Sequence, residues 1–161
     1  MLRIRTFIAA STIPGAGMGV YCMDPVAGGA VIWRLDPEMD RIIDELPEHP
    51  VPREFVTTYG YRPIIGRDCW ILCVDNTRFM NHSGQPNVMD TEDGTIALFD
   101  LPPKTELLCD YRTYDKNPLA WLEQPADGRD GPGSAGPAGQ AASAARAARP
   151  ADAGRAASDP S

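Results

Sequence analysis

The sequence has no long hydrophobic run. A membrane-spanning helix needs about 18 or more consecutive apolar residues, and no such stretch occurs. Residues 1–17 mix polar with apolar side chains and lack the continuous apolar region of a secretion signal. We therefore expect a cytoplasmic protein with no membrane partner. At 161 residues, the chain has room for one domain with one hydrophobic core.

Metal-binding residues are few. The chain has 2 histidines, far apart in the sequence, and 4 cysteines without a Cys-x-x-Cys pair. Zinc sites usually draw on closely spaced pairs of such residues, so we expect no zinc. The cysteines lie within apolar runs and are expected to be buried free thiols: Cys22, Cys69, Cys73 and Cys109.

Positively charged residues are fewer than negatively charged ones. The sequence has 15 Lys and Arg residues against 22 Asp and Glu residues, a formal net charge of −7. Duplex nucleic acid is bound through clustered Lys and Arg that neutralise its phosphates, so we expect no direct nucleic-acid partner. An acidic surface is compatible with a basic peptide, although the same charge also serves solubility alone.

The C-terminal quarter lacks any apolar side chain larger than Ala. Residues 125–161 consist almost entirely of Ala, Gly, Pro, Ser, Asp and Arg. Such a segment cannot bury enough surface to offset the entropy of ordering. We predict one domain over residues 1–124, with a core of about 3–114 and a short C-terminal cap over 115–124, followed by a disordered tail over 125–161.

The remaining sequence favours short strands. Residues 3–9 alternate polar with apolar side chains, and residues 30–35 are β-branched and aromatic. Asp36 before Pro37, with apolar residues at helical spacing as far as Leu46, predicts a short amphipathic helix; residues 53–58 predict a weaker one. The expected fold class is mostly β, with short helices between several small sheets. Further strands are expected at Val20–Cys22, Cys69–Val74, Thr95–Leu101 and Glu106–Tyr111.

A glycine-dense turn follows the first predicted strand. Gly15, Gly17 and Gly19 are spaced two residues apart and lead into another strand. A dinucleotide-binding turn needs G-x-G-x-x-G at the start of a helix, so this spacing does not match one. The glycines allow the backbone to pass close to a ligand, but a plain turn explains them equally well.

Two later segments are more specific. Residues 78–87 read RFMNHSGQPN, and residues 106–111 read ELLCDY. Together with the preceding glycine turn, they resemble the ordered signatures of the SET methyltransferase family: Gly-x-Gly, then RFxNHxxxPN, then ELxxDY. The resemblance runs from about Arg3 to Tyr114, and its spacing is similar to that of small bacterial SET proteins without pre-SET or post-SET modules. It implies a SET-type fold of several small sheets, in which the ELxxDY segment passes beneath the NHxxxPN loop as a C-terminal pseudoknot.

The resemblance also implies an activity, a cofactor and site residues. It implies a protein-lysine methyltransferase that uses S-adenosyl-L-methionine, with a protein carrying an accessible lysine as its partner. Tyr111 is the implied catalytic residue, at the inner end of a substrate channel. The residues implied in cofactor binding are Gly17, Met18, Gly19, Arg78, Asn81 and His82. The expected channel residues are Trp33, Tyr59, Tyr61, Cys109 and Trp121.

Each of these residues also has a purely structural interpretation. Trp33 is equally suited to the core, and Trp121 to docking of the C-terminus. Tyr59 and Tyr61 flank Gly60, where tyrosines often only cover a core edge. Outside their motif, Asn81 and His82 would be read as a turn former and a hydrogen-bonded structural histidine.

The sequence departs from the family at three positions. Gly84 stands where many members have a zinc-binding cysteine, and no cysteine follows Cys109. Cys109 itself replaces a Phe or Tyr that influences how many methyl groups are added, and its smaller side chain would leave room for more than one. Leu35 stands near the position of the family's YxG tyrosine, for which Tyr59 or Tyr61 are candidate substitutes.

These departures keep two alternatives open. One is a catalytically weak or inactive SET-fold module that binds the cofactor or a peptide. The other is a small nucleotide-linked enzyme that uses the glycine turn, which predicts a βαβ unit at the N-terminus.

Overall fold

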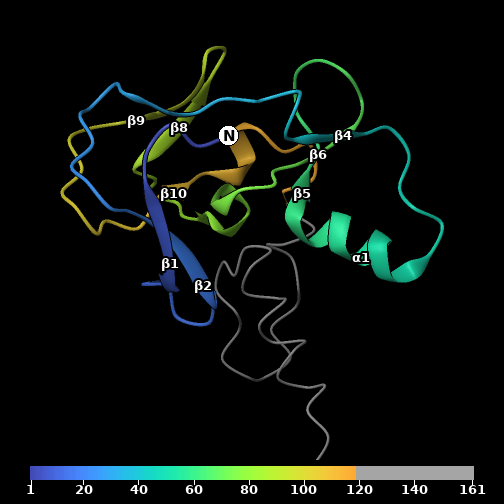
Figure 1. Cartoon of the computed structure of the whole chain (residues 1–161), viewed down its shortest axis with the longest axis horizontal. Coiled ribbons are helices and arrows are strands. Elements are labelled where there is room, and N and C mark those ends of the chain that lie inside the picture. The colour runs from blue at the N-terminus through green and yellow to red at the C-terminus, as the bar shows by residue number, and fades with distance from the viewer. Residues whose placement is uncertain (119–161) are drawn as a thin grey trace, which may run out of the picture.

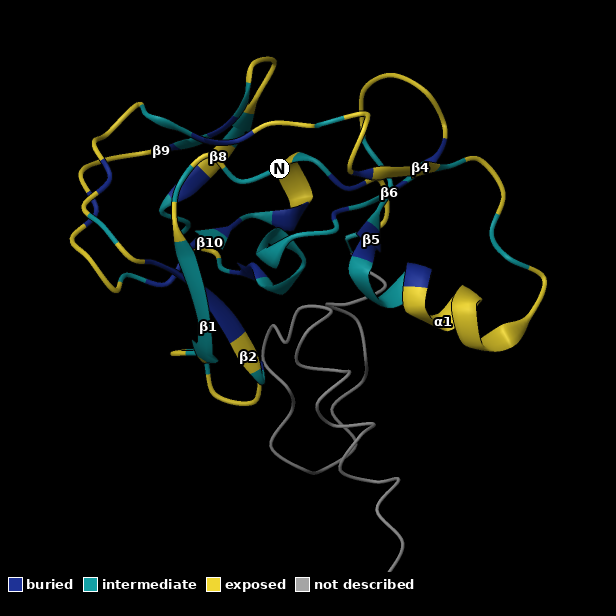
Figure 2. Ribbon diagram, in the orientation of Figure 1, coloured by how far each residue is buried: buried dark blue, intermediate teal, exposed yellow. Residues whose placement is uncertain are grey.

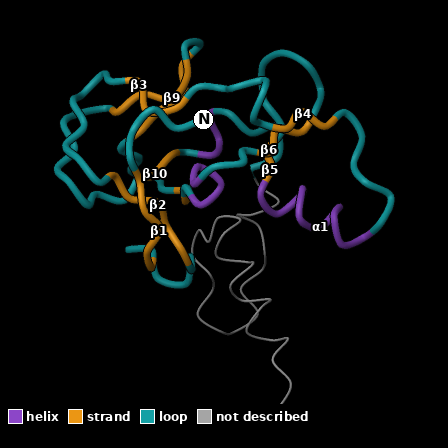
Figure 3. The backbone as a smooth tube through the Cα atoms, viewed as in Figure 1, coloured by secondary structure: helices purple, strands orange, loops and turns teal. Residues whose placement is uncertain are grey.

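The computed structural model describes residues 1–118 and shows four small β-sheets connected by long loops (Figures 1 and 3). In this part of the chain, one α-helix and two 3₁₀ helices accompany the strands. The predicted mostly-β architecture with short helices is confirmed. The elements are β1 (Thr6–Ala10), β2 (Met18–Cys22), β3 (Val31–Trp33), β4 (Arg41–Ile43), α1 (Pro50–Tyr59), β5 (Gly60–Tyr61), β6 (Trp70–Leu72), η1 (Asn76–Phe79), β7 (Asn81–His82), β8 (Val88–Thr91), β9 (Gly94–Ala97), β10 (Leu108–Cys109) and η2 (Tyr111–Thr113).

The glycine turn joins an antiparallel hairpin. Strands β1 and β2 pair from Thr6 opposite Cys22 to Ala10 opposite Met18. Gly15 and Gly17 have φ angles of 80° and 75°, a region that glycine enters without steric cost. An antiparallel hairpin is not a βαβ unit, so the nucleotide-linked alternative is wrong.

Two three-stranded sheets complete most of the domain. Their strand orders are β3-β9-β8 and β4-β6-β5, and all their pairings are antiparallel. Helix α1 leads directly into β5, and the predicted helix over 53–58 is confirmed within it. His49 caps the helix through Nδ1, which accepts a hydrogen bond from Val51 N at 3.3 Å. Figure 2 shows that α1 is largely exposed, with Val56 its buried residue.

The amphipathic helix predicted over 36–46 is wrong. Asp36 caps a turn instead, through a hydrogen bond from Glu38 N to Oδ1 at 3.1 Å. The buried Asp40 carboxylate then accepts hydrogen bonds from Asp36 N at 3.0 Å and Val74 N at 3.3 Å, which fixes the turn against β6. Residues 41–43 continue as β4 beside β6, and Ile42 remains 43% exposed. Strand pairing therefore overrides the helical spacing of the apolar residues.

The segment of residues 105–109 is threaded between two other parts of the chain. On one side, Cys22 N donates to Thr105 O at 3.0 Å and Leu107 N donates to Val20 O at 2.8 Å. On the other side, Ser83 N donates to Cys109 O at 2.9 Å. Residues 105–109 therefore lie between β2 and the 81–87 loop, as the pseudoknot predicts. Within the predicted strand over 106–111, only residues 108–109 form a strand, β10, and Tyr111 begins η2.

The threaded segment also contributes to the hydrophobic core. Leu107 of this segment and Leu101, which precedes it, pack with Val20, Ile32 and Val88, and each of the five is at most 2% exposed. Complete burial of such a side chain stabilises a fold by about 1.5–3 kcal/mol. All four cysteines are buried free thiols, as predicted. No helix within residues 1–118 combines the length and apolar character that crossing a membrane requires.

Candidate functional site

The second and third sequence motifs lie side by side. Strand β7 pairs in parallel with β10, with Asn81 opposite Leu108 and His82 opposite Cys109. Parallel strands are joined only through long connections, so this pairing depends on the threaded segment. It brings RFMNHSGQPN and ELLCDY together although about twenty residues separate them.

Asn81 links these motifs to the glycine turn. Its fully buried side chain donates from Nδ2 to Met18 O at 2.9 Å and to Glu106 Oε1 at 3.2 Å. Its Oδ1 atom is buried and accepts no hydrogen bond from residues 1–118. Buried acceptors are rarely left unpaired, because each unpaired one costs about 1–3 kcal/mol. This oxygen therefore fits an N–H donor supplied by a ligand at the turn.

Glu106, which the sequence reasoning did not single out, organises this region. It is 4% exposed and accepts hydrogen bonds from Ser11 Oγ at 2.7 Å, Thr12 N at 2.6 Å, Thr12 Oγ1 at 2.5 Å and Asn81 Nδ2 at 3.2 Å. Burial alone would raise its pKa, but these donors together lower it below the usual glutamate value. The carboxylate thus stays charged and holds the hairpin loop against β7. Glu106 is the single charged residue in the run Thr105–Cys109, and this is the sequence signal that could have identified it.

Gly19 is required by the position of this carboxylate. A Cβ atom at residue 19 would lie 2.1 Å from Glu106 Oε1 and 2.8 Å from Glu106 Cδ. We expect Gly19→Ala to lower the free energy of unfolding by about 1–3 kcal/mol, measured by urea unfolding, because the overlap forces Glu106 off its donors. Gly84→Ala is the matched control, since nothing lies within 4 Å of a Cβ there. Equal stability of the two variants would contradict this account.

The same carboxylate should shape the stability of the protein in acid. Its folded-state pKa lies below the usual value, so its contribution is present above about pH 4.5 and is lost as the pH falls towards the folded pKa. We expect Glu106→Gln to be less stable than wild type at pH 7 by about 2 kcal/mol. We also expect this difference to shrink steadily below about pH 4.5. Urea unfolding of both proteins between pH 3 and pH 7 measures it, and a constant difference over that range would contradict the prediction.

His82 and Tyr111 form the other side of the site. The Tyr111 amide N donates to His82 Nδ1 at 3.1 Å, so Nδ1 carries no proton. Burial lowers the pKa of His82 despite Asp110 Oδ1 at 3.7 Å from Nδ1, which leaves the imidazole neutral near pH 7. The Tyr111 hydroxyl donates to Met80 O at 2.7 Å, and burial raises its pKa well above the usual tyrosine value. The hydroxyl is therefore a neutral, fixed group rather than a phenolate.

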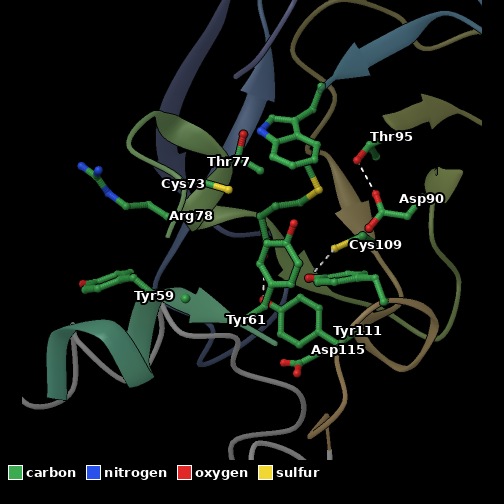
Figure 4. A pocket seen from close by; sticks show the side chains of 14 residues that line it. Tyr59, Tyr61, Cys73, Thr77, Arg78, Asp90, Thr95, Cys109, Tyr111 and Asp115 are labelled. Carbon is green, nitrogen blue, oxygen red and sulfur yellow. Dashed lines mark hydrogen bonds between the residues drawn. The ribbon is translucent and has the colours of Figure 1, made fainter. Parts of the chain in front are cut away.

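Tyr111 lines a cavity of about 60 Å³ with largely aromatic walls (Figure 4). Six of the predicted site residues lie around it: Trp33, Tyr59, Tyr61, Arg78, Cys109 and Tyr111. The other lining residues are Gly60, Cys73, Thr77, Met80, Asp90, Thr95, Tyr114 and Asp115. Two buried atoms of the lining, Trp33 Nε1 and Thr77 Oγ1, have no hydrogen-bond partner within residues 1–118.

Among residues 1–118, the remaining predicted residues do not line this cavity. Gly17, Met18 and Gly19 lie at the hairpin, and Asn81 and His82 lie between the hairpin and Tyr111. The predicted residues thus form two connected groups, one at the glycine turn and one at the cavity.

Arg78, predicted at the cofactor, donates from Nη1 to Val74 O at 2.9 Å and stacks over Phe79 at 5.2 Å. Trp121, most of the predicted cap and the predicted tail lie outside the described residues.

A second tyrosine occupies the space beside Cys109. The Tyr114 hydroxyl lies 3.6 Å from Cys109 Sγ, and its ring packs edge-on against Tyr61 at 5.1 Å and Tyr111 at 5.8 Å. Burial raises the pKa of the Cys109 thiol to about 12, so the sulfur stays protonated. Tyr114 therefore lies beside the small Cys109 side chain at the wall of the cavity. Sequence reasoning could not find this, because the contact depends on the turn of η2.

The sheets and the threaded segment define a SET-type fold. Solved structures support the same class: a humanized mutant of the Chaetomium thermophilum Polycomb Repressive Complex 2 bound to the inhibitor GSK343 matches with a TM-score of 0.52 at 17% identity, over 74% of this chain and 16% of that one. The crystal structure of the Chaetomium thermophilum complex matches with a TM-score of 0.51 at 17% identity, over 71% of this chain and 16% of that one. This chain therefore spans about a sixth of each of these two chains.

Other comparisons add no closer relative. No protein-family model matches the sequence, and no curated protein matches it. At 17% identity the likeness establishes the fold alone, because one fold can carry many different activities.

Proposed function

We propose that this chain transfers a methyl group from S-adenosyl-L-methionine to the side-chain amine of a lysine in another protein. The observation that carries the proposal is the meeting of two half-sites. Asn81 Oδ1, a buried acceptor without a hydrogen-bond partner among residues 1–118, lies beside the glycine turn, and the fixed hydroxyl of Tyr111 lies at the aromatic cavity. The β7–β10 pairing and the hydrogen bond from Tyr111 N to His82 join the two.

The glycine-turn half-site suits the cofactor. S-adenosyl-L-methionine supplies a methyl group on a positively charged sulfonium, and its methionine part carries an ammonium group. Asn81 Oδ1 would accept a hydrogen bond from that ammonium, while the backbone of Gly17, Met18 and Gly19 allows close approach. Met18 is 37% exposed, so the turn lies at the protein surface, where a ligand can approach it.

The cavity suits a lysine side chain. Tyr59, Tyr61 and Tyr111 offer ring faces and edges to an alkyl-ammonium, which aromatic rings attract through their quadrupoles. Free lysine has a pKa of about 10.4, so its amine must lose a proton before it can attack a methyl group. Desolvation by the cavity walls lowers that pKa, and a neighbouring positive charge lowers it further.

Tyr111 would then position the amine. Its hydroxyl keeps its proton near neutral pH and is held by Met80 O at 2.7 Å. One lone pair of the hydroxyl oxygen remains available to an N–H group of the substrate. Rate enhancement in this arrangement comes mainly from holding the reacting atoms in line.

Two measurements test the proposed function. Incubation of the protein with methyl-labelled S-adenosyl-L-methionine and a cell extract should label a protein, and digestion should locate the label on lysine. Calorimetry should show cofactor binding by the wild type, weakened by Asn81→Ala. Binding without transfer to any protein would favour the binding-module alternative, and absence of binding would count against both.

A further inference from the structure

The cavity wall contains little charge. The hydroxyls of Tyr61, Tyr111 and Tyr114 stay neutral near pH 7, as do the thiols of Cys73 and Cys109, because burial raises the pKa of each of these groups. The charged side chains that line it are Arg78, Asp90 and Asp115. A charged ligand end group would therefore be selected by these three.

Two of the three are already engaged. The Arg78 guanidinium donates to Val74 O and stacks on the ring of Phe79. The Asp115 carboxylate accepts from Asn117 N at 3.0 Å and Arg62 N at 3.3 Å, both on Oδ1. Both side chains thus have partners that fix them at the wall.

Asp90 is different. Its Oδ1 accepts a hydrogen bond from Thr95 Oγ1, the residue opposite it in the β8–β9 pairing. Within residues 1–118, its Oδ2 accepts no hydrogen bond, as is also true of Asp115 Oδ2, and no basic side chain forms an ion pair with it. Asp115 has two backbone donors and the charge of Arg62, which partly offsets the rise in its pKa that burial causes, whereas Asp90 has one hydroxyl donor and no such cation. Figure 4 shows the Asp90 carboxylate turned towards the cavity beside Cys109, across from Tyr59 and Arg78.

An unpaired carboxylate in such a place is costly. Burial raises the pKa of Asp90, which shows that its charged form is penalised by the surrounding apolar and aromatic groups. A cation beside Oδ2 would stabilise the charged carboxylate, and a neutral ligand would not. The aromatic walls favour the same choice, because ring faces attract cations.

We propose that Asp90 recognises the cationic end group of the substrate, with Oδ2 accepting a hydrogen bond from a primary ammonium whose alkyl stem lies among the tyrosine rings. The inference rests on the proposed function, since it names the residue that selects a lysine amine there. An ion pair raises the pKa of an amine. The role of Asp90 therefore belongs to capture of the ammonium, before the proton is lost.

The test uses small probes that stand in for the end of a lysine side chain. The n-butylammonium ion and butan-1-ol have the same four-carbon stem and differ in charge. In NMR titrations of the full chain at pH 7 and low salt, we expect wild type to bind n-butylammonium about tenfold more tightly than butan-1-ol. Asp90→Asn should reduce this preference to about twofold or less, because the carboxamide carries no charge.

Asp115→Asn is the matched control. It removes the same charge from the same cavity wall, and we expect it to keep most of the preference for n-butylammonium. Equal binding of the two probes by wild type, an undiminished preference in Asp90→Asn, or equal losses in both variants would each overturn the proposal. If Asp90→Asn does not fold, Asp115→Asn decides: loss of the preference for n-butylammonium in that variant would overturn the proposal.

The outcome is separable from that of the proposed function, because neither probe requires S-adenosyl-L-methionine. Methyl transfer to lysine without charge selectivity would reject Asp90 alone. Charge selectivity without cofactor binding would reject the proposed methyl transfer and retain a cation-binding cavity.

Discussion

Tyr111→Phe should lower the rate of methyl transfer by about 100-fold or more, which corresponds to about 2.7 kcal/mol of lost transition-state stabilisation. The change removes one oxygen from a residue that is 4% exposed and keeps the ring that packs against Tyr114 at 5.8 Å. Loss of the hydroxyl removes the group that would orient the amine, while the glycine turn and Asn81 stay in place. Binding of S-adenosyl-L-methionine should therefore change by less than about threefold.

Initial rates of label transfer, with calorimetry of cofactor binding, measure this effect. Tyr114→Phe is the matched control, because it removes a second hydroxyl from the same cavity, one whose hydrogen-bonding contact is Cys109 Sγ at 3.6 Å. We expect that variant to retain most of the activity. Equal rates for wild type and Tyr111→Phe would remove Tyr111 from the mechanism.

Asn81→Asp should have the largest effect on stability. The substitution keeps the shape of the side chain but replaces the Nδ2 donor, now 3.2 Å from Glu106 Oε1, with a carboxylate oxygen. Two buried carboxylates at that distance cannot both stay charged, so one must take up a proton or the contact must break. We expect the free energy of unfolding to fall by about 3–5 kcal/mol.

A fall of that size lowers the thermal midpoint of a domain this large by roughly 10 °C or more, which calorimetry measures directly. Gln85→Glu makes the same amide-to-acid change at an exposed position and should leave the midpoint nearly unchanged. Asn81→Ala separates the effects, because it removes the donor without adding charge and should cost less than Asn81→Asp. A midpoint for Asn81→Asp equal to that of wild type would contradict the observed contact with Glu106.

Of the two helices predicted from the sequence, one formed and one did not. The helix formed where the tertiary contacts agree with the local preference of the backbone. The helix over 53–58 formed as part of α1, since His49 caps it and the preceding prolines suit a first turn. The helix over 36–46 did not form, because Asp40 is drawn into hydrogen bonds with Asp36 N and Val74 N and residues 41–43 pair with β6. The periodicity of the sequence cannot predict the contact with Val74, because Val74 lies 34 residues from Asp40 along the chain.

In the candidate site, the motif residues could be named from the sequence, but their long-range contacts could not. The motif residues Asn81, His82 and Tyr111 were named from the sequence, and the structure brings them together. Glu106 was quoted within its motif but its hydrogen-bond network was not foreseen, because its partners Ser11 and Thr12 lie about 95 residues away. Asp90 and Tyr114 carry no motif at all, and only the cavity reveals them.

By itself, the sequence determined a small, mostly β domain, its buried thiols, the order of three motifs and the likeness to a SET-type fold. These properties depend on composition, on local backbone preference and on short patterns, all of which can be read along the chain. The tertiary structure alone decided that residues 105–109 pass between β2 and the 81–87 loop, that Glu106 joins the hairpin to Asn81, and that Asp90 faces an aromatic cavity. These contacts join residues far apart in sequence, so they exist only once the chain is packed.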